Sequence, residues 1–233
     1  MMTPRFDILG QALGDASRTR MLCELMDGRA YTNKELAAVA GVSPQTATAH
    51  LRLLAEAGLI TAMKSGRCVY HRIATTEVAE MLERMAAVAP MNDLYLAQRR
   101  KAGDLAVLRS CYDHLAGPLA VRLTQSFLER GMLVEENGGY AARACETWAR
   151  LGVTLPTKSS TRPFARPCLD WTERKAHVAG PMGRQMLDYG LECGWYRRAS
   201  SKRGLVVTRD GRQALQQILG LDPNSFEMGV EHA

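Results

Sequence analysis

Apolar residues recur at intervals of three to four positions between residues 5 and 26, with one interruption at Gly14. This spacing predicts two amphipathic helices that share one buried side. Asp15 or Ser17, just after the interruption, would cap the second helix. The chain therefore begins with a pair of short helices that need further elements to cover their apolar faces.

The stretch that follows predicts two more helices joined by a tight turn. Thr32 and Glu35 have the spacing of a capping box, and Gly41 suits the left-handed residue that ends a helix. Ser43 would cap the next helix, with Pro44 at its first position, where a missing N–H costs nothing. Two helices joined in this way form a helix-turn-helix.

The second of these helices has an unusual surface composition. Its core positions are expected to be Ala47, Leu51, Leu54 and Ala55, while short polar side chains and no carboxylate occupy the rest of residues 43–55. Side chains of this kind can approach base edges and phosphates in a major groove. A neutral surface helix is the alternative. The residues expected to face DNA here are Thr32, Asn33, Lys34, Ser43, Gln45, Thr46, Thr48, His50 and Arg52.

A β-hairpin is predicted directly after the second helix. Residues 59–63 and 68–73 read as its two strands, and the turn between them carries Lys64 and Arg67. A hairpin with a basic tip after such a helix is the wing of a winged helix. Its two cations would contact phosphates and add salt-dependent affinity rather than sequence specificity.

The overall composition is compatible with a polyanionic partner. Lysine and arginine outnumber acidic residues 30 to 24, which gives a net charge of +6 and a pI of about 9.1. No apolar run approaches the roughly 18 residues of a membrane span, and the N-terminus does not resemble a signal peptide. We expect a cytoplasmic protein without a membrane partner, whose six cysteines are dispersed rather than arranged as a disulfide framework.

Three segments of the first ninety residues closely resemble the ArsR/SmtB family of bacterial winged-helix repressors. They are SRTRMLCELM, ELAAVAGVSPQTATAHLRLLAEAGLI and KSGRCVYHRI, and the resemblance covers about residues 5–90. It implies a homodimer packed through the first and last helices of this region. It also implies binding to an inverted-repeat operator in double-stranded DNA, relieved by a metal ion or another inducer.

The familiar metal sites of that family do not carry over to this chain. Residues 31–36, where relatives often hold a Cys-x-Cys motif, contain neither a thiol nor an imidazole. Residues 77–89 match the helix that holds the other site, and they contain glutamates but no histidine. The inducer is therefore expected to bind elsewhere in the chain.

The chain continues well beyond the region of resemblance. An amphipathic helix over residues 76–88 and a second helical stretch over residues 94–110 favour pairing with a dimer mate, with a solvated spacer as the alternative. We expect residues 1–90 to form the winged helix-turn-helix domain, 91–110 a helical linker, and 111–233 a duplicated effector or dimerisation domain. The fold class would be mainly α with small β-hairpins (α+β).

Residues 111–233 contain an internal repeat. CYDHLAGP at residues 111–118 corresponds to a longer copy at residues 168–181, and both read Cys-x-Asp followed by His-apolar-Ala-Gly-Pro. Each copy precedes a helix, a short strand pair and a final helix, the final ones expected at residues 146–152 and 210–220. This order predicts two tandem winged-helix-like units.

The repeated motif supplies residues that bind transition metals. A composite site for zinc or another transition-metal ion would draw on Cys111, Asp113, His114, Cys168, Asp170 and His177. Two alternatives stay open. Each motif could instead be structural, with the aspartate capping the next helix and the cysteine buried. Trp171 beside Asp170 could also form a site for an organic effector.

These patterns favour a dimeric, sequence-specific DNA-binding repressor, released by a metal, a thiol-reactive species or a small molecule at the C-terminal domain. An architectural DNA-binding protein without an effector is one alternative. A Cys/His-dependent enzyme is another, but the sequence has no phosphate-binding glycine loop and no nucleophile elbow to support it. We therefore expect no catalytic residues.

Overall fold

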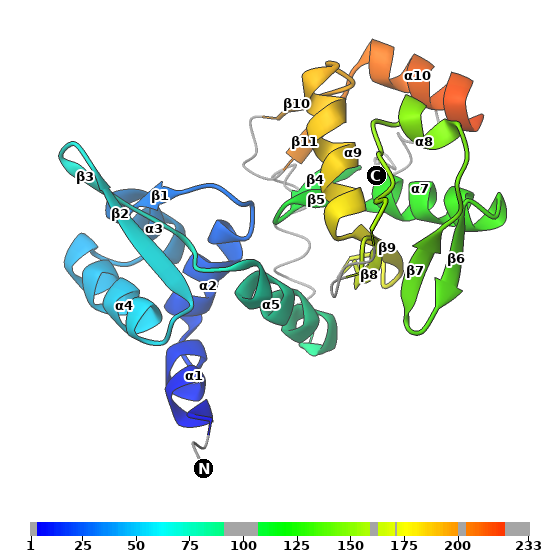
Figure 1. Ribbon diagram of the computed structural model, residues 1–233. Coiled ribbons are helices and arrows are strands. Elements are labelled where there is room, and N and C mark those ends of the chain that lie inside the picture. Colours follow the sequence, from blue (N-terminus) through cyan, green and yellow to red (C-terminus); the bar gives the residue numbers. More distant parts are fainter. Residues whose placement is uncertain (1–3, 91–106, 159–162, 171, 200–203, 222–233) are drawn as a thin grey trace, which may run out of the picture. The chain divides into compact units, whose positions relative to one another are not determined.

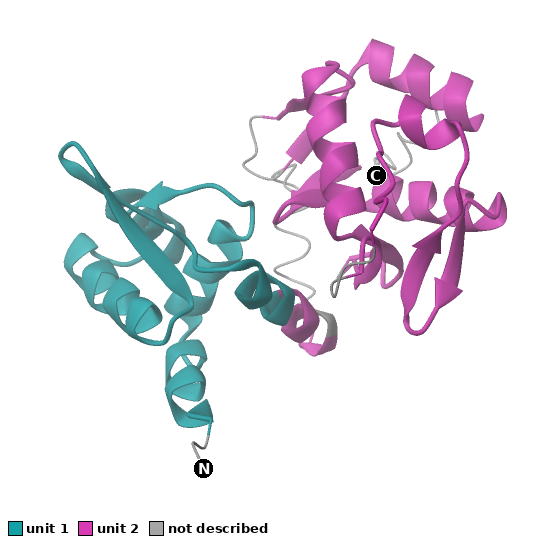
Figure 2. Ribbon diagram, in the orientation of Figure 1, with its two compact units in different colours: residues 1–82 teal, residues 83–233 magenta. Residues whose placement is uncertain are grey.

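The computed structural model describes residues 4–90, 107–158, 163–170, 172–199 and 204–221. The chain forms two compact units, residues 1–82 and 83–233 (Figure 2). The boundary falls inside one helix, α5 (Thr76–Val88). The expected boundaries at residues 90 and 110 stay a prediction, because residues 91–106 of the expected linker lie outside the described residues.

The first unit is a winged helix-turn-helix (Figure 1). Its strands form one antiparallel sheet in the order β1-β3-β2. The elements before α5 are α1 (Phe6–Leu13), α2 (Ala16–Leu25), β1 (Tyr31–Thr32), α3 (Asn33–Ala40), α4 (Pro44–Glu56), β2 (Ile60–Ser65) and β3 (Cys68–Ile73).

Local hydrogen bonds begin and end these helices where the sequence predicts. The Asp15 side chain accepts from the first backbone N–H groups of α2, and Thr32 and Glu35 form the capping box of α3. Gly41 ends α3 with φ of 70°, a conformation that costs little without a Cβ. Ser43 caps α4 by accepting from the Thr46 N–H at 3.1 Å. The helix-turn-helix prediction is confirmed.

The α4 helix turns a narrow apolar stripe toward the core. Ala47, Leu51 and Leu54 are buried, as predicted, but Ala55 is exposed. Ala55 lies one residue past the stripe, where the helix has already rotated toward solvent. The helix thus keeps most of its surface free for another partner.

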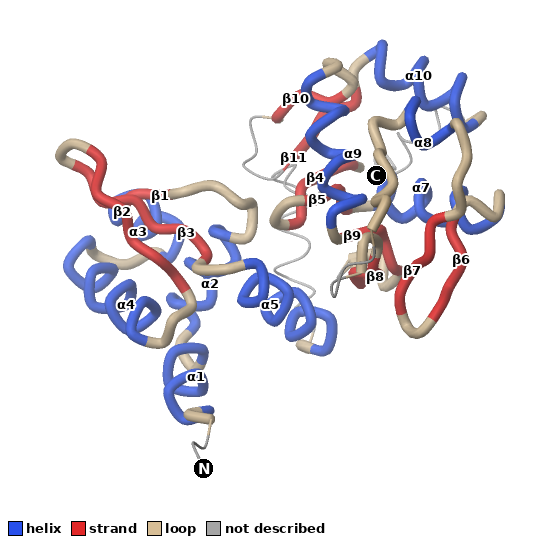
Figure 3. The backbone as a smooth tube through the Cα atoms, in the orientation of Figure 1, coloured by secondary structure: helices blue, strands red, loops and turns tan. Residues whose placement is uncertain are grey.

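The second unit contains two successive segments with the same element order: hairpin, helix, hairpin, helix (Figure 3). The first contains β4 (Leu108–Cys111), β5 (His114–Ala116), α7 (Pro118–Glu129), β6 (Leu133–Glu136), β7 (Gly139–Ala142) and α8 (Thr147–Arg150). The second contains β8 (Arg166–Leu169), β9 (Ala176–Ala179), α9 (Pro181–Glu192), β10 (Tyr196–Arg198), β11 (Gly204–Val207) and α10 (Arg209–Leu219).

The hairpins of the two segments join across the unit. One sheet has the order β10-β11-β4-β5, so the last hairpin of the second segment extends the first hairpin of the first. A single bridge between Tyr140 and Ala165 brings β7 beside the β8–β9 hairpin. The chain as a whole is a mixed α+β protein, with a winged helix-turn-helix followed by an α/β region of small sheets.

Several expected elements differ in the structure. The prediction that a helix extends to Ser110 is wrong at its C-terminal end, because Leu108–Cys111 form the strand β4. The motif residues lie on hairpins that the sequence did not predict, and the predicted helix 146–152 is only Thr147–Arg150. Residues 200–203, between β10 and β11, lie outside the described residues.

One core holds the second unit together. It gathers side chains from both segments, and the Phe127 and Trp148 rings meet edge to face with centroids 4.9 Å apart. Both are fully buried, and such aromatic pairs add to the stability that burial provides. Within the described part of the chain, no helix is long and apolar enough to cross a membrane.

Candidate metal site and DNA-binding surface

Two hairpins of the second unit each present a cysteine and a histidine as a cross-strand pair. Cys111 lies opposite His114 in the β4–β5 hairpin, and Cys168 lies opposite His177 in the β8–β9 hairpin. Residues directly opposite in an antiparallel pair point to the same face, with Cβ atoms about 5 Å apart. Each hairpin therefore offers one sulfur and one imidazole on one side.

The two cross-strand pairs meet in the interior. One ligand atom from each of Cys111, His114, Cys168 and His177 lies within 4.8 Å of every other. The Nε2 atoms of the two histidines are 3.1 Å apart. His114 and His177 are 0% and 1% exposed. This is a closed set of two sulfur and two nitrogen donors from four strands.

The donor set fits a tetrahedral ion. Zinc binds imidazole nitrogen at about 2.0–2.1 Å, which places two nitrogens of a tetrahedral site about 3.3 Å apart. The observed separation of 3.1 Å is close to that value. Buried Cys₂His₂ sets without a carboxylate or a water ligand are typical of zinc and similar soft ions, not of magnesium or calcium.

The two aspartates of the motif lie behind the histidines rather than among the four donors. Asp113 Oδ1 is 3.2 Å from His114 Nδ1, and Asp170 Oδ2 is 3.5 Å from His177 Nδ1. Carboxylates in this position orient an imidazole and strengthen it as a ligand. The structure thus divides the six residues predicted as ligands into four donors and two supporting carboxylates.

Asp170 also connects the two segments of the unit. Its Oδ1 atom accepts from Arg109 Nη2 at 2.5 Å, and its Oδ2 atom accepts from the Gly117 N–H at 2.7 Å. The Arg109 and Asp170 side chains are 4% and 0% exposed. In the structural alternative the aspartates cap helices that begin near residues 116–118 or 179–181. Asp170 does bind the backbone at the start of α7, but that helix belongs to the other segment.

The four donors influence each other's protonation. The Cys168 side chain lowers the pKa of the Cys111 thiol well below its usual value by hydrogen bonding to its sulfur. Burial works to lower the pKa of His114, but Asp113, Cys111 and Glu83 outweigh it and raise that pKa to about 10. The lowered pKa favours the thiolate form of Cys111 that a metal ion needs, whereas His114 must lose a proton before its imidazole can bind one.

Glu83 from the last part of α5 adjoins both sulfurs. Its Oε1 atom is 3.1 Å from Cys111 Sγ, and its Oε2 atom is 3.3 Å from Cys168 Sγ. Only 7% of the Glu83 side chain is exposed, and burial, reinforced by Cys111, raises its pKa to about 8. The sequence places this glutamate on an amphipathic helix without histidine, and nothing in its local pattern indicates the contact with the sulfurs.

Gly183 in α9 lets that helix approach the site closely. A Cβ atom there would lie 2.4 Å from the Val178 carbonyl oxygen and 3.0 Å from His114 Cβ. We expect Gly183→Ala to destabilise the second unit by about 1–3 kcal/mol, because the backbone must shift to relieve the overlap. Urea unfolding measures this change.

Gly10→Ala in α1 is the matched control, because a Cβ there meets nothing within 4 Å. That change should leave stability equal or raise it by about 0.5–1 kcal/mol. Equal stability of Gly183→Ala and the parent protein would contradict the close approach of α9 to His114.

The first unit presents the surface predicted to face DNA. Gln45, Thr46, Thr48 and Arg52 are exposed along α4, and Lys34 is exposed on α3. Arg52 lies 3.5 Å from Glu56, one turn further on, in an exposed pair that contributes little. The part of α4 before Glu56 carries no carboxylate, so its surface suits a polyanion.

Two of the residues predicted to face DNA have structural partners. His50 is held by Arg18, whose Nη1 lies 3.1 Å from His50 Nδ1, and its side chain is only 15% exposed. Thr48 accepts from the Asn33 amide at 2.6 Å, which connects α3 to α4. The first contact joins α2 to α4, and the second joins the two helices of the motif.

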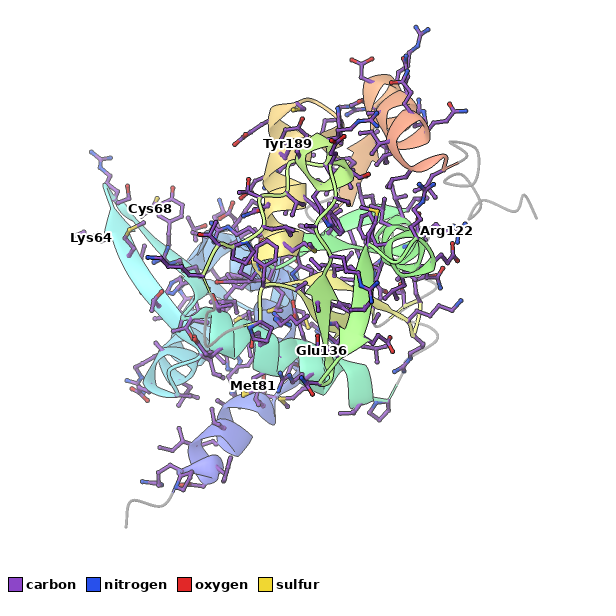
Figure 4. The ribbon with its side chains drawn as sticks, turned by 45° about the vertical axis from the view of Figure 1, so that its right-hand side comes forward. Lys64, Cys68, Met81, Arg122, Glu136 and Tyr189 are labelled. Atoms are coloured by element: carbon purple, nitrogen blue, oxygen red, sulfur yellow. The ribbon has the colours of Figure 1, made fainter. Side chains whose placement is uncertain are left out.

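The wing is the β2–β3 hairpin. Lys64 pairs with Val69 and Ser65 with Cys68, so the turn comprises Gly66 and Arg67. Figure 4 shows Lys64 projecting at the end of the hairpin, and both Lys64 and Arg67 are exposed. Two cations at an exposed tip can reach a phosphate backbone without disturbing the fold.

A winged helix-turn-helix is the fold of many DNA-binding transcription regulators. A family model described as a helix-turn-helix domain matches residues 13–61. The chain is similar to the uncharacterized HTH-type transcriptional regulator YdfF of Bacillus subtilis (strain 168). The two are 37% identical over 224 residues, which cover 94% of this chain and 99% of that protein. The chain belongs to the ArsR family of helix-turn-helix transcriptional regulators.

Other relatives match a shorter part of the chain. The HTH-type transcriptional regulator CmtR of Mycobacterium tuberculosis (strain ATCC 25618 / H37Rv) is 33% identical over 99 residues, covering 41% of this chain and 83% of that protein. The structure of the homodimeric winged helix-turn-helix domain of Mb0332 from Mycobacterium bovis is 29% identical, covering 40% and 82% of the two chains with a TM-score of 0.34. YdfF and CmtR are transcriptional regulators, not enzymes.

Proposed function

We propose that this protein is a dimeric repressor that binds an inverted-repeat operator and is released when a zinc-like ion binds Cys111, His114, Cys168 and His177. The observation that carries the proposal is the closed Cys₂His₂ set in the unit that follows the DNA-binding unit. A bound ion would join four strands of two hairpins and make that unit more rigid. Cytoplasmic localisation is part of the proposal.

We interpret the second unit as a tandem duplication. The shared order of elements and the equivalent Cys–His pairs of the two first hairpins support this interpretation. Under a duplication, each copy contributes half of one composite site. The site then requires both copies, which would explain why the motif occurs twice. The organic-effector alternative involves Trp171, which lies outside the described residues.

Dimerisation through α1 and α5, as the family resemblance implies, is consistent with their exposed apolar side chains. Phe6 on α1 is 73% exposed, and Met85 and Val88 on α5 are 43% and 84% exposed. Contiguous exposed apolar patches mark interfaces, and a dimer through these helices would cover the three side chains. A dimer would present two α4 helices to half-sites about one DNA turn apart.

The DNA contacts divide into two kinds that a titration can separate. Lys64→Ala with Arg67→Ala should weaken binding to the operator and to random DNA alike. It should also lower the slope of log affinity against log salt by about 0.9 for each phosphate that the wing no longer neutralises. Gln45→Ala should weaken operator binding by about 1–3 kcal/mol and leave random-DNA binding unchanged, because base contacts carry the specificity.

The control for these variants is Lys158→Ala, which removes an exposed lysine from the second unit. It should change neither the slope nor the affinity. Fluorescence anisotropy at several salt concentrations measures both quantities. Wing variants with an unchanged salt slope, or a Gln45→Ala protein with full operator affinity, would contradict the proposed DNA-binding surface.

A further inference from the structure

His50 differs from its exposed neighbours on α4, because its side chain is mostly covered by the protein. It follows Ala47 by three positions, which places it beside the buried stripe of α4, and its side chain is 15% exposed. Its Nδ1 atom is 3.1 Å from Arg18 Nη1, and its Nε2 atom is 3.9 Å from Asp15 Oδ1. Both ring nitrogens therefore face groups at the start of α2.

The guanidinium group of Arg18 also holds the end of another helix. Its Nε donates to the Ala12 carbonyl oxygen at 2.7 Å, and its Nη2 donates to the Gln11 carbonyl oxygen at 2.7 Å. These belong to the last four carbonyl groups of α1, which have no partner further along their own helix. Arg18 itself is only 9% exposed. One buried side chain thus joins the end of α1 to the middle of α4.

The chemistry of the two side chains defines the direction of their bond. Arginine can only donate, so His50 accepts at Nδ1. The planar fork of a guanidinium group can reach three acceptors in fixed directions, whereas an ammonium group is a single point charge on a flexible stem. A base contact depends on the distance and angle of its hydrogen bonds, so a helix that reads bases must be held closely.

We propose that Arg18 and His50 are positioning residues for operator recognition, whose hydrogen bond holds α4 where its exposed side chains can read the bases. His50 then acts within the protein and does not contact DNA, in contrast to the role expected for it from the sequence. This inference rests on the proposed operator binding and names two residues on which the specificity of that binding depends.

Three substitutions separate positioning from direct contact. His50→Ala removes the acceptor, and Arg18→Lys keeps the charge but loses the fork. Each should weaken operator binding by about 10-fold or more, the ratio that corresponds to a hydrogen bond to a charged group. In His50→Asn the side-chain oxygen can replace Nδ1 as the acceptor, while nothing replaces Nε2. That variant should bind the operator within about 2–3-fold of the parent protein, the scatter expected when no coupling is lost.

The double variant Arg18→Lys with His50→Ala tests the bond itself. If both residues act through one bond, the double variant should bind the operator no more weakly than the weaker single variant. The slope of log affinity against log salt should stay at the parent value in every variant, because no phosphate contact is removed. Arg20→Lys, at an exposed arginine of the same helix, is the matched control and should keep the parent affinity.

The operator for these measurements is a duplex that the zinc-free parent protein selects from a random library, and a scrambled duplex of the same length is the reference. Fluorescence anisotropy of the full chain gives both affinities, and urea unfolding establishes that each variant is folded. Binding to the scrambled duplex should not change in any variant. If Arg18→Lys does not fold, the comparison of His50→Ala with His50→Asn decides the question.

Four results would overturn the inference. An equal loss in His50→Asn and His50→Ala would mean that the imidazole itself contacts the operator. Full operator affinity of His50→Ala would mean that the bond does not position α4. Additive losses in the double variant would mean that the two residues act separately. If the parent protein selects no sequence from the library, the proposed operator binding fails first and the inference fails with it.

Discussion

Replacing Cys168 by serine should reduce zinc affinity by more than about 100-fold. Supporting residues around a metal cost about 10–100-fold when they are changed, and removal of one of four donors costs more. A serine hydroxyl is a poor substitute for a thiolate, which zinc binds in its deprotonated form. Cys168 is 5% exposed and lies opposite His177, so solvent cannot readily complete the site.

Two matched variants show whether the effect belongs to the site. Cys193→Ser changes an exposed free cysteine of the same unit and should leave zinc affinity unchanged. Asp113→Asn changes the carboxylate behind His114 and should reduce affinity by about 10–100-fold. Zinc affinity is measured by chelator competition. Equal affinity of the Cys168→Ser and Cys193→Ser proteins would show that Cys168 is not a zinc ligand.

Replacing Arg109 by alanine should destabilise the second unit by about 3–5 kcal/mol, because Asp170 would keep a buried negative charge without its cation. The pair is nearly inaccessible to water, so solvent cannot replace the guanidinium. Burial would raise the pKa of Asp170, but Arg109 and the hydrogen bonds to Asp170 outweigh it and lower that pKa. The stabilisation is therefore present above the ordinary aspartate pKa and is lost as pH falls through the lowered one.

Arg122→Ala provides the control for Arg109→Ala. Arg122 forms an ion pair with Glu129 at 3.3 Å, but their side chains are 48% and 63% exposed. Such surface pairs contribute about 0–1 kcal/mol. Urea unfolding of the zinc-free proteins at neutral pH should separate the two variants clearly. Equal stability would mean that Asp170 does not depend on Arg109.

The helix-turn-helix could be predicted from the sequence because its signals are local. A capping box, a glycine with positive φ and a Ser-Pro start each act within a few residues, and the structure has all of them at the predicted positions. The wing follows from two β-prone segments around a basic turn. Elements that depend on partners distant in the sequence are harder to predict. Leu108–Cys111, for example, form a strand because β5 and β11 flank them.

The candidate ligands could be predicted as a group from the sequence, but their geometry could not. Cysteine and histidine are three positions apart in the first copy and nine apart in the second, so sequence spacing conceals that each pair lies directly across two strands. The short first loop is possible because Tyr112 adopts φ of 53°. Glu83 lies 28 residues before Cys111, and Arg109 lies 61 residues before Asp170, so no local pattern marks either contact.

We propose that an ion at the Cys₂His₂ site controls DNA binding. The most direct measurement titrates a labelled operator with the chelator-treated full chain, then repeats the titration with one equivalent of zinc per chain. We predict saturable, salt-sensitive binding that zinc weakens by about 5–150-fold in the parent protein and not in Cys168→Ser. Identical operator affinity of the parent protein with and without bound zinc would contradict the claim.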